Sequence, residues 1–269
     1  DALLKEGYTH VVDADLQGYF DSIPHEGLMD RIAAHISDGR LLALLKGWLQ
    51  QDIVQEMRRW TPTAGTPQGA VISPLLANVY LHPLDVKMKA QGYRMVRYAD
   101  DFVILCETAS QAQEALEQVR QWVAQNGLSL HPDKTHVGDC TQRGQGFEFL
   151  GYRFEAGRRW VRDKSLKGLK DKVREKTKRT RGESLRVVIK ELGPMLKGWF
   201  GYFKHAYKST FPSIDGFIRR RLRAMLRKQQ KSPGMGRSQV DHKRWPNEYF
   251  AQLGLFTMTQ ARMQASQSR

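Results

Sequence analysis

Cysteine is scarce in these 269 residues, where Cys106 and Cys140 are the only two. Two thiols are too few for a disulfide framework or a cysteine-rich zinc site, and such scarcity is typical of a reducing cytoplasm. No uninterrupted apolar run approaches the roughly 18–20 residues that a membrane-spanning helix needs, so no membrane partner is expected. The first ten residues are mixed and polar and do not resemble a secretory signal peptide.

Acidic residues are also few in the second part of the chain. Residues 1–155 contain 14 Lys and Arg against 20 Asp and Glu, whereas residues 156–269 contain 29 against 8. The net charge is therefore −6 in the first part and +21 in the second. A positive charge of this size indicates a polyanionic partner, above all nucleic acid. The alternative is a surface that is merely solubilising, but solubility needs far less charge.

The periodicity of apolar residues predicts an order of elements. In the first part, strands are expected over 9–16, 93–98, 102–106 and 147–154, and helices over 24–36, 38–50, 74–90 and 110–125; a short strand over 159–161 follows. The second part is expected to contain Lys- and Arg-rich helices over 163–181, 184–192, 194–208 and 213–230, then a loop over 232–237. This order predicts an α+β domain over 1–155 and a basic helical domain over 156–269.

Two pairs of aspartates interrupt apolar strands. Asp100 and Asp101 lie between two predicted strands, where neighbouring carboxylates raise one another's pKa unless a cation is present. Oxygen-rich clusters of this kind suit Mg²⁺, although Asp is also common in polar turns. Asp13 and Asp15 share one face of the first strand with Val11, and an Asp in a buried strand needs a partner or a metal. Periodicity alone does not show that Asp15 meets Asp100 in space.

Five blocks of sequence resemble the motifs of group II intron reverse transcriptases, and they occur in that family's order. They are Val12–His25, Gly65–Asn78, Arg97–Phe102 with the Tyr-x-Asp-Asp signature, Leu128–Thr135 and Phe147–Tyr152. Two further blocks, Gly198–Phe203 and Trp245–Phe250, are similar to the thumb, or maturase, region of the same enzymes. The resemblance implies a right-hand palm, built as a small antiparallel sheet backed by helices, and then a helical thumb and maturase (X) domain.

The resemblance also implies a mechanism, in-line phosphoryl transfer with two Mg²⁺ ions, for which Mn²⁺ is a possible substitute. Catalytic and metal-binding roles carry over to Asp15, Asp100 and Asp101, and the backbone carbonyl of Leu16 is expected to touch a metal. Asp15 aligns because it directly precedes Leu-Gln-Gly-Tyr-Phe, which leaves Asp13 with a structural role. Lys134 is a candidate proton donor to pyrophosphate or a phosphate-binding cation, and otherwise a surface lysine.

The resemblance also assigns roles in contacting the nucleotide and the primer to several further residues. Phe20 matches the steric gate against a ribose 2′-hydroxyl, the alternative being plain core packing. Gln68 and Gly69 match the loop over the incoming nucleotide. The primer grip corresponds to Phe149, Leu150 and Gly151, where glycine permits close approach of a backbone.

The basic helices are expected to neutralise phosphates of RNA. The residues expected to bind RNA are Lys167, Lys170, Arg174, Lys178, Arg179, Arg181, Arg219, Arg220, Arg223 and Arg227. Aromatic residues such as Trp199, Phe203 and Phe217 are interleaved with them. These three are expected in a helical core, while others could stack on unpaired bases.

The implied function is that of an RNA-directed DNA polymerase and intron maturase in the bacterial cytoplasm, associated with the nucleoid when it acts on DNA. Its expected partners are structured intron RNA, an RNA template with a DNA primer, dNTP and target DNA. The family's fingers region normally precedes the first motif, so a truncated, split or incomplete chain is expected. No Cys/His-rich nuclease domain is expected after residue 258, and in this respect the chain resembles the proteins encoded by compact class C introns.

Two other functions stay open from the sequence. One is a reverse transcriptase of the same lineage recruited to CRISPR spacer acquisition or phage defence, which would keep the same catalytic residues. The other is a non-catalytic RNA-binding splicing factor, against which the intact Asp15, Asp100 and Asp101 argue.

Overall fold

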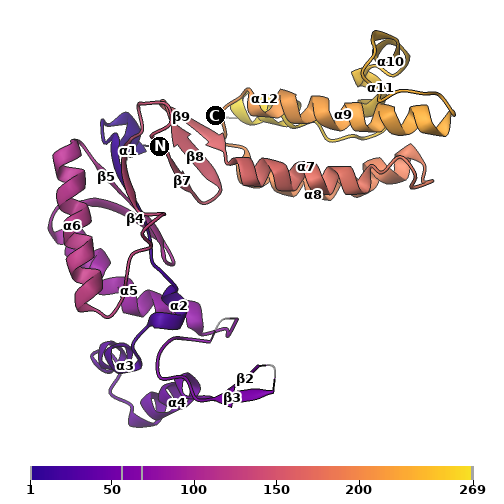
Figure 1. The fold of residues 1–269 in the computed structure, drawn as a ribbon. Coiled ribbons are helices and arrows are strands. Elements are labelled where there is room, and N and C mark those ends of the chain that lie inside the picture. The colour runs from indigo at the N-terminus through magenta and orange to yellow at the C-terminus, as the bar shows by residue number, and fades with distance from the viewer. Residues whose placement is uncertain (1, 56, 68, 268–269) are drawn as a thin grey trace. The chain divides into compact units, whose positions relative to one another are not determined.

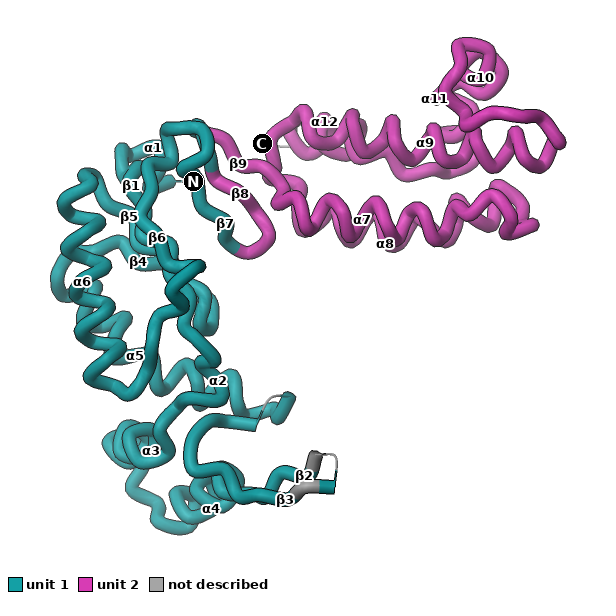
Figure 2. The backbone as a smooth tube through the Cα atoms, viewed as in Figure 1, with its two compact units in different colours: residues 1–149, 155–157 teal, residues 150–154, 158–269 magenta. Residues whose placement is uncertain are grey.

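The computed structural model describes residues 2–55, 57–67 and 69–267. They form two compact units (Figure 2). One comprises the chain up to Phe149 together with residues 155–157, and the other comprises residues 150–154 and the chain from Arg158 onward. The functional assignment of residues 1–155 as palm and 156–269 as thumb stays a prediction.

The first unit mixes helices with short strands (Figure 1). In chain order its elements are α1 (Ala2–Lys5), β1 (His10–Asp15), α2 (Tyr19–Ser22), α3 (His25–Ala33), α4 (Gly39–Leu49), β2 (Ile53–Gln55), β3 (Arg58–Trp60), α5 (Ser73–Ala90), β4 (Arg94–Tyr98), β5 (Asp101–Cys106), α6 (Ala109–Gln125), β6 (His136–Asp139) and β7 (Phe147–Phe149). The predicted strands and helices before residue 126 are confirmed to within a few residues at each end. The β2–β3 hairpin, α1, α2 and β6 had not been predicted.

An antiparallel sheet of order β4-β5-β1-β6 forms the centre of this unit. Val12 and Ala14 of β1, with Phe102 and Ile104 of β5, are fully buried on one face. Helix α6 packs against β1, β5 and β6, and α5 packs against β4. Because side chains alternate along a strand, burying Val12 and Ala14 turns Asp13 and Asp15 to the opposite face. The predicted α+β class, with a small antiparallel sheet backed by helices, is confirmed.

Side-chain caps start two of the helices in this unit, α4 and α6. The Asp38 carboxylate accepts a hydrogen bond from the Arg40 amide at 2.8 Å and starts α4. The Thr108 hydroxyl accepts one from the Gln111 amide at 3.2 Å and starts α6. Side-chain oxygens at these positions satisfy amide groups that the first helical turn leaves unpaired.

The second unit begins with strands and is otherwise helical. Its elements are β8 (Tyr152–Glu155), β9 (Arg158–Val161), α7 (Asp163–Lys176), α8 (Leu185–Phe203), α9 (Thr210–Gln229), α10 (Gln239–Arg244), α11 (Asn247–Gln252) and α12 (Met258–Gln267). They enclose a core that includes Leu192, Leu196, Phe211 and Leu222. Phe203 is buried there, while Trp199 and Phe217 pack against it partly buried, as predicted.

In the region after residue 146, the end of one helix, the course of one strand and the break between two helices were predicted wrongly. The helix expected over 163–181 ends at Lys176. The single strand expected over 147–154 is broken, because Leu150 and Gly151 take the left-handed region with φ of 49° and 78°. The two helices expected on either side of Gly193-Pro194 are one helix, α8. A proline in a helix removes one backbone hydrogen bond, and here the buried Leu192 and Leu196 on either side keep the helix packed.

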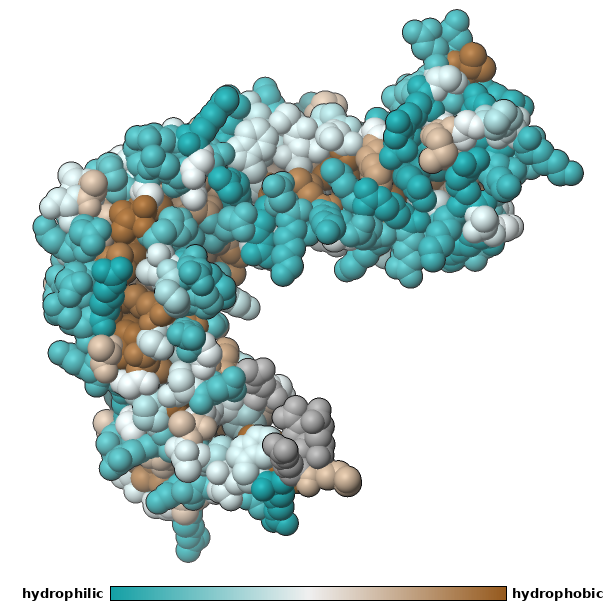
Figure 3. Space-filling view, in the orientation of Figure 1, coloured by the Kyte–Doolittle hydropathy of each residue, from teal (hydrophilic) through white to brown (hydrophobic). Residues whose placement is uncertain are grey.

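Hydrophilic side chains cover most of the visible face of the second unit, and apolar ones show between its helices (Figure 3). This agrees with the positive charge of residues 156–269. Among the residues that the structure describes, no helix is both long and apolar enough to cross a membrane.

Candidate active site

The pairing of β1 with β5 brings two of the predicted acidic residues together. Asp15 is the direct partner of Asp101 in the antiparallel register. Residues directly opposite one another in such a pair have Cβ atoms roughly 4.5–5.5 Å apart on the same face. Asp100 lies in the two-residue turn that joins β4 to β5, after Ala99 with a φ of 55°. Three carboxylates from two segments that are distant in sequence therefore lie at one end of the sheet.

Arg97 holds this turn, a role that had not been predicted for it. Its Nη1 donates to the Ala99 carbonyl at 2.8 Å and to Asn78 Oδ1 at 2.8 Å, and its Nε donates to Asp85 Oδ1 at 2.8 Å. The arginine thus fastens the hairpin tip to α5. A charged residue on an apolar strand beside the Asp pair was the signal available in the sequence.

Lys134 contacts the acidic site directly. Its Nζ lies 2.6 Å from Asp15 Oδ2, and this hydrogen bond, with the charges of Asp15 and Asp100, raises the lysine's pKa. The preceding loop is tied to the end of β1, since the His131 amide donates to the Asp15 carbonyl at 2.8 Å and the Gln17 amide to the Ser129 carbonyl at 2.9 Å. The buried Leu16 forms an isolated bridge with Leu130 in the same tie.

Asp13 lies deeper on the same face. Burial raises its pKa to about 6; the nearby charges of Asp101 and Asp15 add to the rise, while His136 and a backbone hydrogen bond from Glu148 oppose it. His136 Nε2 is 3.9 Å from Asp13 Oδ2. The carboxylates on this face therefore interact, and their mutual repulsion favours a bound cation.

The donor chemistry of the site fits a hard divalent cation. Asp15, Asp100 and Asp101 offer only oxygen donors, the kind that Mg²⁺ prefers. Within the described part of the chain, no group of three or more His, Cys, Asp or Glu side chains is already arranged to hold a metal ion. The ammonium of Lys134 instead occupies Asp15 Oδ2. A metal at Asp15 would therefore bind through Oδ1 or displace the ammonium of Lys134 from Oδ2.

Backbone hydrogen bonds anchor the segment before the predicted nucleotide loop. The Thr66 amide donates to the Phe20 carbonyl at 2.6 Å, and the Gly65 amide donates to the Ile23 carbonyl at 2.8 Å. Gly65 has a φ of 87°, and a Cβ there would lie 2.8 Å from the carbonyl oxygens of Phe20 and Asp21. Only glycine fits such a close approach.

Of the two loop residues predicted to cover the nucleotide, Gln68 and Gly69, the structure describes one. Gln68 lies outside the described residues, whereas Gly69 has a φ of 87° in a turn. After it, the Ser73 hydroxyl donates to the Pro67 carbonyl at 2.7 Å. Phe20 is half-buried on α2, packs against the core and meets the Tyr19 ring edge-on at 5.6 Å between centroids. Its steric-gate role stays a prediction.

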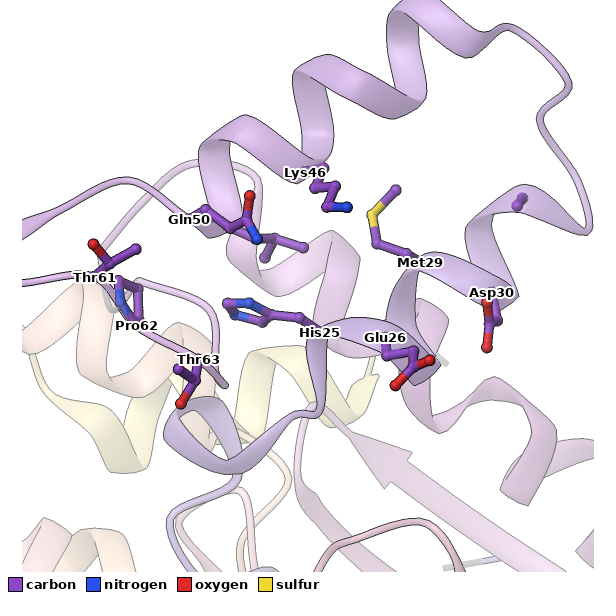
Figure 4. A pocket seen from close by; sticks show the side chains of 11 residues that line it. His25, Glu26, Met29, Asp30, Lys46, Gln50, Thr61, Pro62 and Thr63 are labelled. Atoms are coloured by element: carbon purple, nitrogen blue, oxygen red, sulfur yellow. The ribbon is translucent and has the colours of Figure 1, made fainter.

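His25 gives the same segment a side-chain anchor. Its Nε2 donates to the Gly65 carbonyl at 2.7 Å, and the imidazole points into a cavity of about 700 Å³ between α3, α4 and residues 61–63 (Figure 4). None of the three catalytic candidates is among the described residues that line this cavity. The cavity therefore lies outside the acidic site, and His25 is a residue whose anchoring role had not been predicted.

The predicted primer grip falls where the chain passes from one compact unit to the other. Phe149 ends β7 in the first unit. In the second unit, the Tyr202 hydroxyl donates to the Leu150 carbonyl at 2.9 Å, and a Cβ at Gly151 would lie 3.4 Å from the Phe203 ring. Leu150 and Gly151 are thus fixed to α8.

The predicted RNA-binding residues fall into three groups. Lys167, Lys178 and Arg174 are exposed, Arg174 with an ion pair to Asp171 at 2.5 Å, and Lys170, Arg179, Arg219 and Arg220 are partly exposed. Arg181 pairs with Glu183 and Glu191, and Arg227 with Asp241. Arg223 is only 2% exposed and donates to the Trp245 carbonyl at 2.9 Å. Arg223 and Arg227 therefore have internal roles that periodicity did not predict.

The raised pKa of Asp13 has a consequence for stability. Its folded-state value of about 6 exceeds the ordinary 3.8, so the folded protein prefers the protonated carboxyl. The resulting destabilisation is absent below pH 3.8 and complete above about pH 6, where it is on the order of 2–3 kcal/mol. Asp13→Asn should therefore gain stability over the parent across this window, as measured by urea unfolding with a chelator present. A difference that does not change with pH would contradict this assignment.

The sequence matches two known families in different parts. Residues 2–154 match the family described as reverse transcriptase (RNA-dependent DNA polymerase). Residues 166–245 match the group II intron, maturase-specific domain. The first match alone covers more than half of the chain.

The chain is also similar to individual proteins. Protein YkfC of Escherichia coli is 31% identical over 181 residues, which cover 53% of this chain and 46% of that protein. The group II intron-encoded protein LtrA of Lactococcus lactis is 39% identical over 74 residues, 28% of this chain and 12% of that protein. The chain thus spans less than half the length of these relatives.

A solved structure shares the fold. The apo telomerase of Candida tropicalis aligns with a TM-score of 0.51 at 11% identity, over 85% of this chain and 44% of that one. The family match over residues 2–154 shows that the chain belongs to the reverse transcriptase family, and residues 166–245 carry a group II intron maturase-specific domain.

Proposed function

We propose that this chain is the catalytic part of a group II intron RNA-directed DNA polymerase and maturase. The observation that carries the proposal is the direct pairing of Asp15 with Asp101, beside Asp100 and Lys134. Reverse transcriptases use divalent metal ions and act on nucleic acid. For this chain the proposed cofactor is a pair of Mg²⁺ ions, and the substrates are dNTP, a DNA primer and an RNA template.

The three carboxylates would hold the metals, which when bound supply activation of the primer 3′-hydroxyl and neutralisation of phosphate charge. The remaining work falls to the protein. Asp100 is positioned by the hairpin that Arg97 fastens to α5. Lys134, which Asp15 keeps protonated, carries a proton at Nζ that it can donate to the leaving pyrophosphate.

We propose that two parts of the chain select the nucleotide: Phe20 and the loop at Gln68 and Gly69. Phe20 would exclude a ribose 2′-hydroxyl, and the loop at Gln68 and Gly69 would cover the nucleotide. The Phe20 carbonyl accepts a hydrogen bond from the Thr66 amide, so the proposed gate is tied to the segment that precedes this loop. Competition between dNTP and rNTP in Phe20→Ala tests this part, because loss of the ring should weaken the preference for dNTP.

The maturase role rests on the second unit. Residues 166–245, which match the maturase-specific domain, contain most of the chain's excess of positive charge. We propose that they bind structured intron RNA, assist its folding for splicing, and hold the RNA that is copied after insertion into target DNA. This would take place in the bacterial cytoplasm, at the nucleoid when DNA is the target.

Primer extension on an RNA template with Mg²⁺, by the natural full-length protein, tests the polymerase proposal. Asp100→Asn should reduce the rate about 10²–10³-fold or more, because it removes a negative metal ligand. Binding of intron RNA should be retained, since Asp100 belongs to the first unit and the basic helices belong to the second.

Glu117→Gln on the exposed surface of α6 is the matched control and should leave synthesis unchanged. Equal synthesis by Asp100→Asn and the parent would contradict the polymerase proposal. A parent protein that binds intron RNA and promotes splicing, but never extends a primer, would support the non-catalytic splicing factor instead.

A further inference from the structure

A small cavity in the second unit is lined mainly by basic side chains. Its volume is about 260 Å³. The polar and basic side chains that line it are those of Arg219, Arg220, Arg223, Arg237, His242 and Asn247. The first three follow one another along one face of α9, and the others come from the loop and short helices that follow it.

A network of side-chain contacts fixes the loop between α9 and α10 against α9. Arg227 Nε lies 2.5 Å from Asp241 Oδ1, and its Nη1 also donates to the Pro233 carbonyl. Asp241 in turn accepts from the Ser238 hydroxyl at 2.7 Å, within a capping box that starts α10. Residues on both sides of Arg237 are therefore held in place.

Gly236 lets this loop lie directly on the helix. It has a φ of 72°, and a Cβ there would lie 2.7 Å from the Ala224 amide nitrogen and 2.8 Å from the Arg220 carbonyl oxygen. Any other residue would push the loop outward. The close approach brings Arg237 to the same cavity as Arg220.

Arg223 forms a fixed inner wall. It is 2% exposed, its Nε donates to the Trp245 carbonyl at 2.9 Å, and its Nη2 donates to Asn247 Oδ1 at 3.1 Å. With its oxygen accepting from Arg223, the Asn247 carboxamide keeps its NH₂ group as a hydrogen-bond donor. The wall therefore presents donors in fixed positions.

The positive charge of this cavity is not balanced by the protein. Asp241 forms its ion pair with Arg227. Among the residues that the structure describes, no carboxylate lies within ion-pair distance of Arg219, Arg220 or Arg237. Burial lowers the pKa of Arg220, and the charges of Arg237 and Arg174 lower it further. Like charges held together in this way are costly unless an anion compensates them.

We propose that this cavity binds a single backbone phosphate of RNA. Guanidinium groups match phosphate oxygens in bidentate geometry, and several arginines converging on a small space suit one anion better than an extended surface. The inference rests on the proposed function in one respect, that the phosphate belongs to RNA rather than being free in solution. It assigns these arginines to one phosphate and separates them from the dispersed charges of α7.

The test compares the full protein with the double variant Arg219→Gln/Arg220→Gln. Inorganic phosphate is titrated while the arginine Nε–H resonances are followed by NMR, and intron RNA binding is measured over a range of salt concentrations. In the double variant the plot of log affinity against log salt should become shallower by about one, not two, because both arginines hold the same phosphate. Saturable phosphate shifts in the parent should disappear.

The matched control is Lys89→Gln/Arg120→Gln, which removes two exposed positive charges from α5 and α6, outside the region proposed to bind RNA. It should leave both readouts as in the parent. Arg237→Gln, a change on the exposed loop, replaces the double variant if that variant fails to fold. An equal loss of slope in the pocket variant and the control, or phosphate shifts that persist without the arginines, would overturn the proposal.

Phosphate shifts in the parent with no change in RNA binding would show a site for a free phosphate anion, which would also overturn it. If the parent protein fails to extend a primer but shows the expected phosphate shifts and salt dependence of RNA binding, only the polymerase proposal is contradicted.

Discussion

The register between β1 and β5 is the constraint on which the acidic site depends. Val12 and Ala14 must face the core beneath α6, so Asp13 and Asp15 face the other way, and Asp15 is set opposite Asp101. A slip of one residue would bury the carboxylates and expose the core side chains, at a cost that no polar contact in the site could offset. The hydrophobic core thus fixes the position of the charged groups.

Holding these carboxylates close together is unfavourable, and the surrounding residues show how the fold accommodates it. Burial raises the pKa of Asp13, and the charges of Asp101 and Asp15 add to the rise, while Lys134 pairs with Asp15 and Arg97 anchors the turn that carries Asp100. The second unit holds a comparable group of like charges, but positive ones, where several arginines line one cavity. Each concentration of like charge points to a ligand of the opposite charge.

Much of this architecture could be predicted from the sequence, because α6 carries helical periodicity and a local cap at Thr108, and β1 and β5 are short runs of apolar residues. Sequence motifs pointed to Asp15, Asp100 and Asp101, but only the strand register shows that Asp15 and Asp101 are neighbours. Features that depend on tertiary contacts could not be predicted. The turn at Leu150-Gly151, the unbroken helix through Pro194 and the burial of Arg223 each follow from packing between segments distant in sequence. A basic residue in a helix gives no sign of whether it faces solvent or a backbone carbonyl.

The most direct test of the central claim is the affinity for Mn²⁺, measured by electron paramagnetic resonance on the protein without nucleic acid. If Asp15 and Asp101 share a cation site, Asp15→Asn and Asp101→Asn should each weaken binding by about 10-fold or more, since each removes a charged ligand. Lys134→Met should strengthen binding, because its ammonium competes for Asp15 Oδ2. Equal Mn²⁺ affinity in the parent and both aspartate variants would contradict the account.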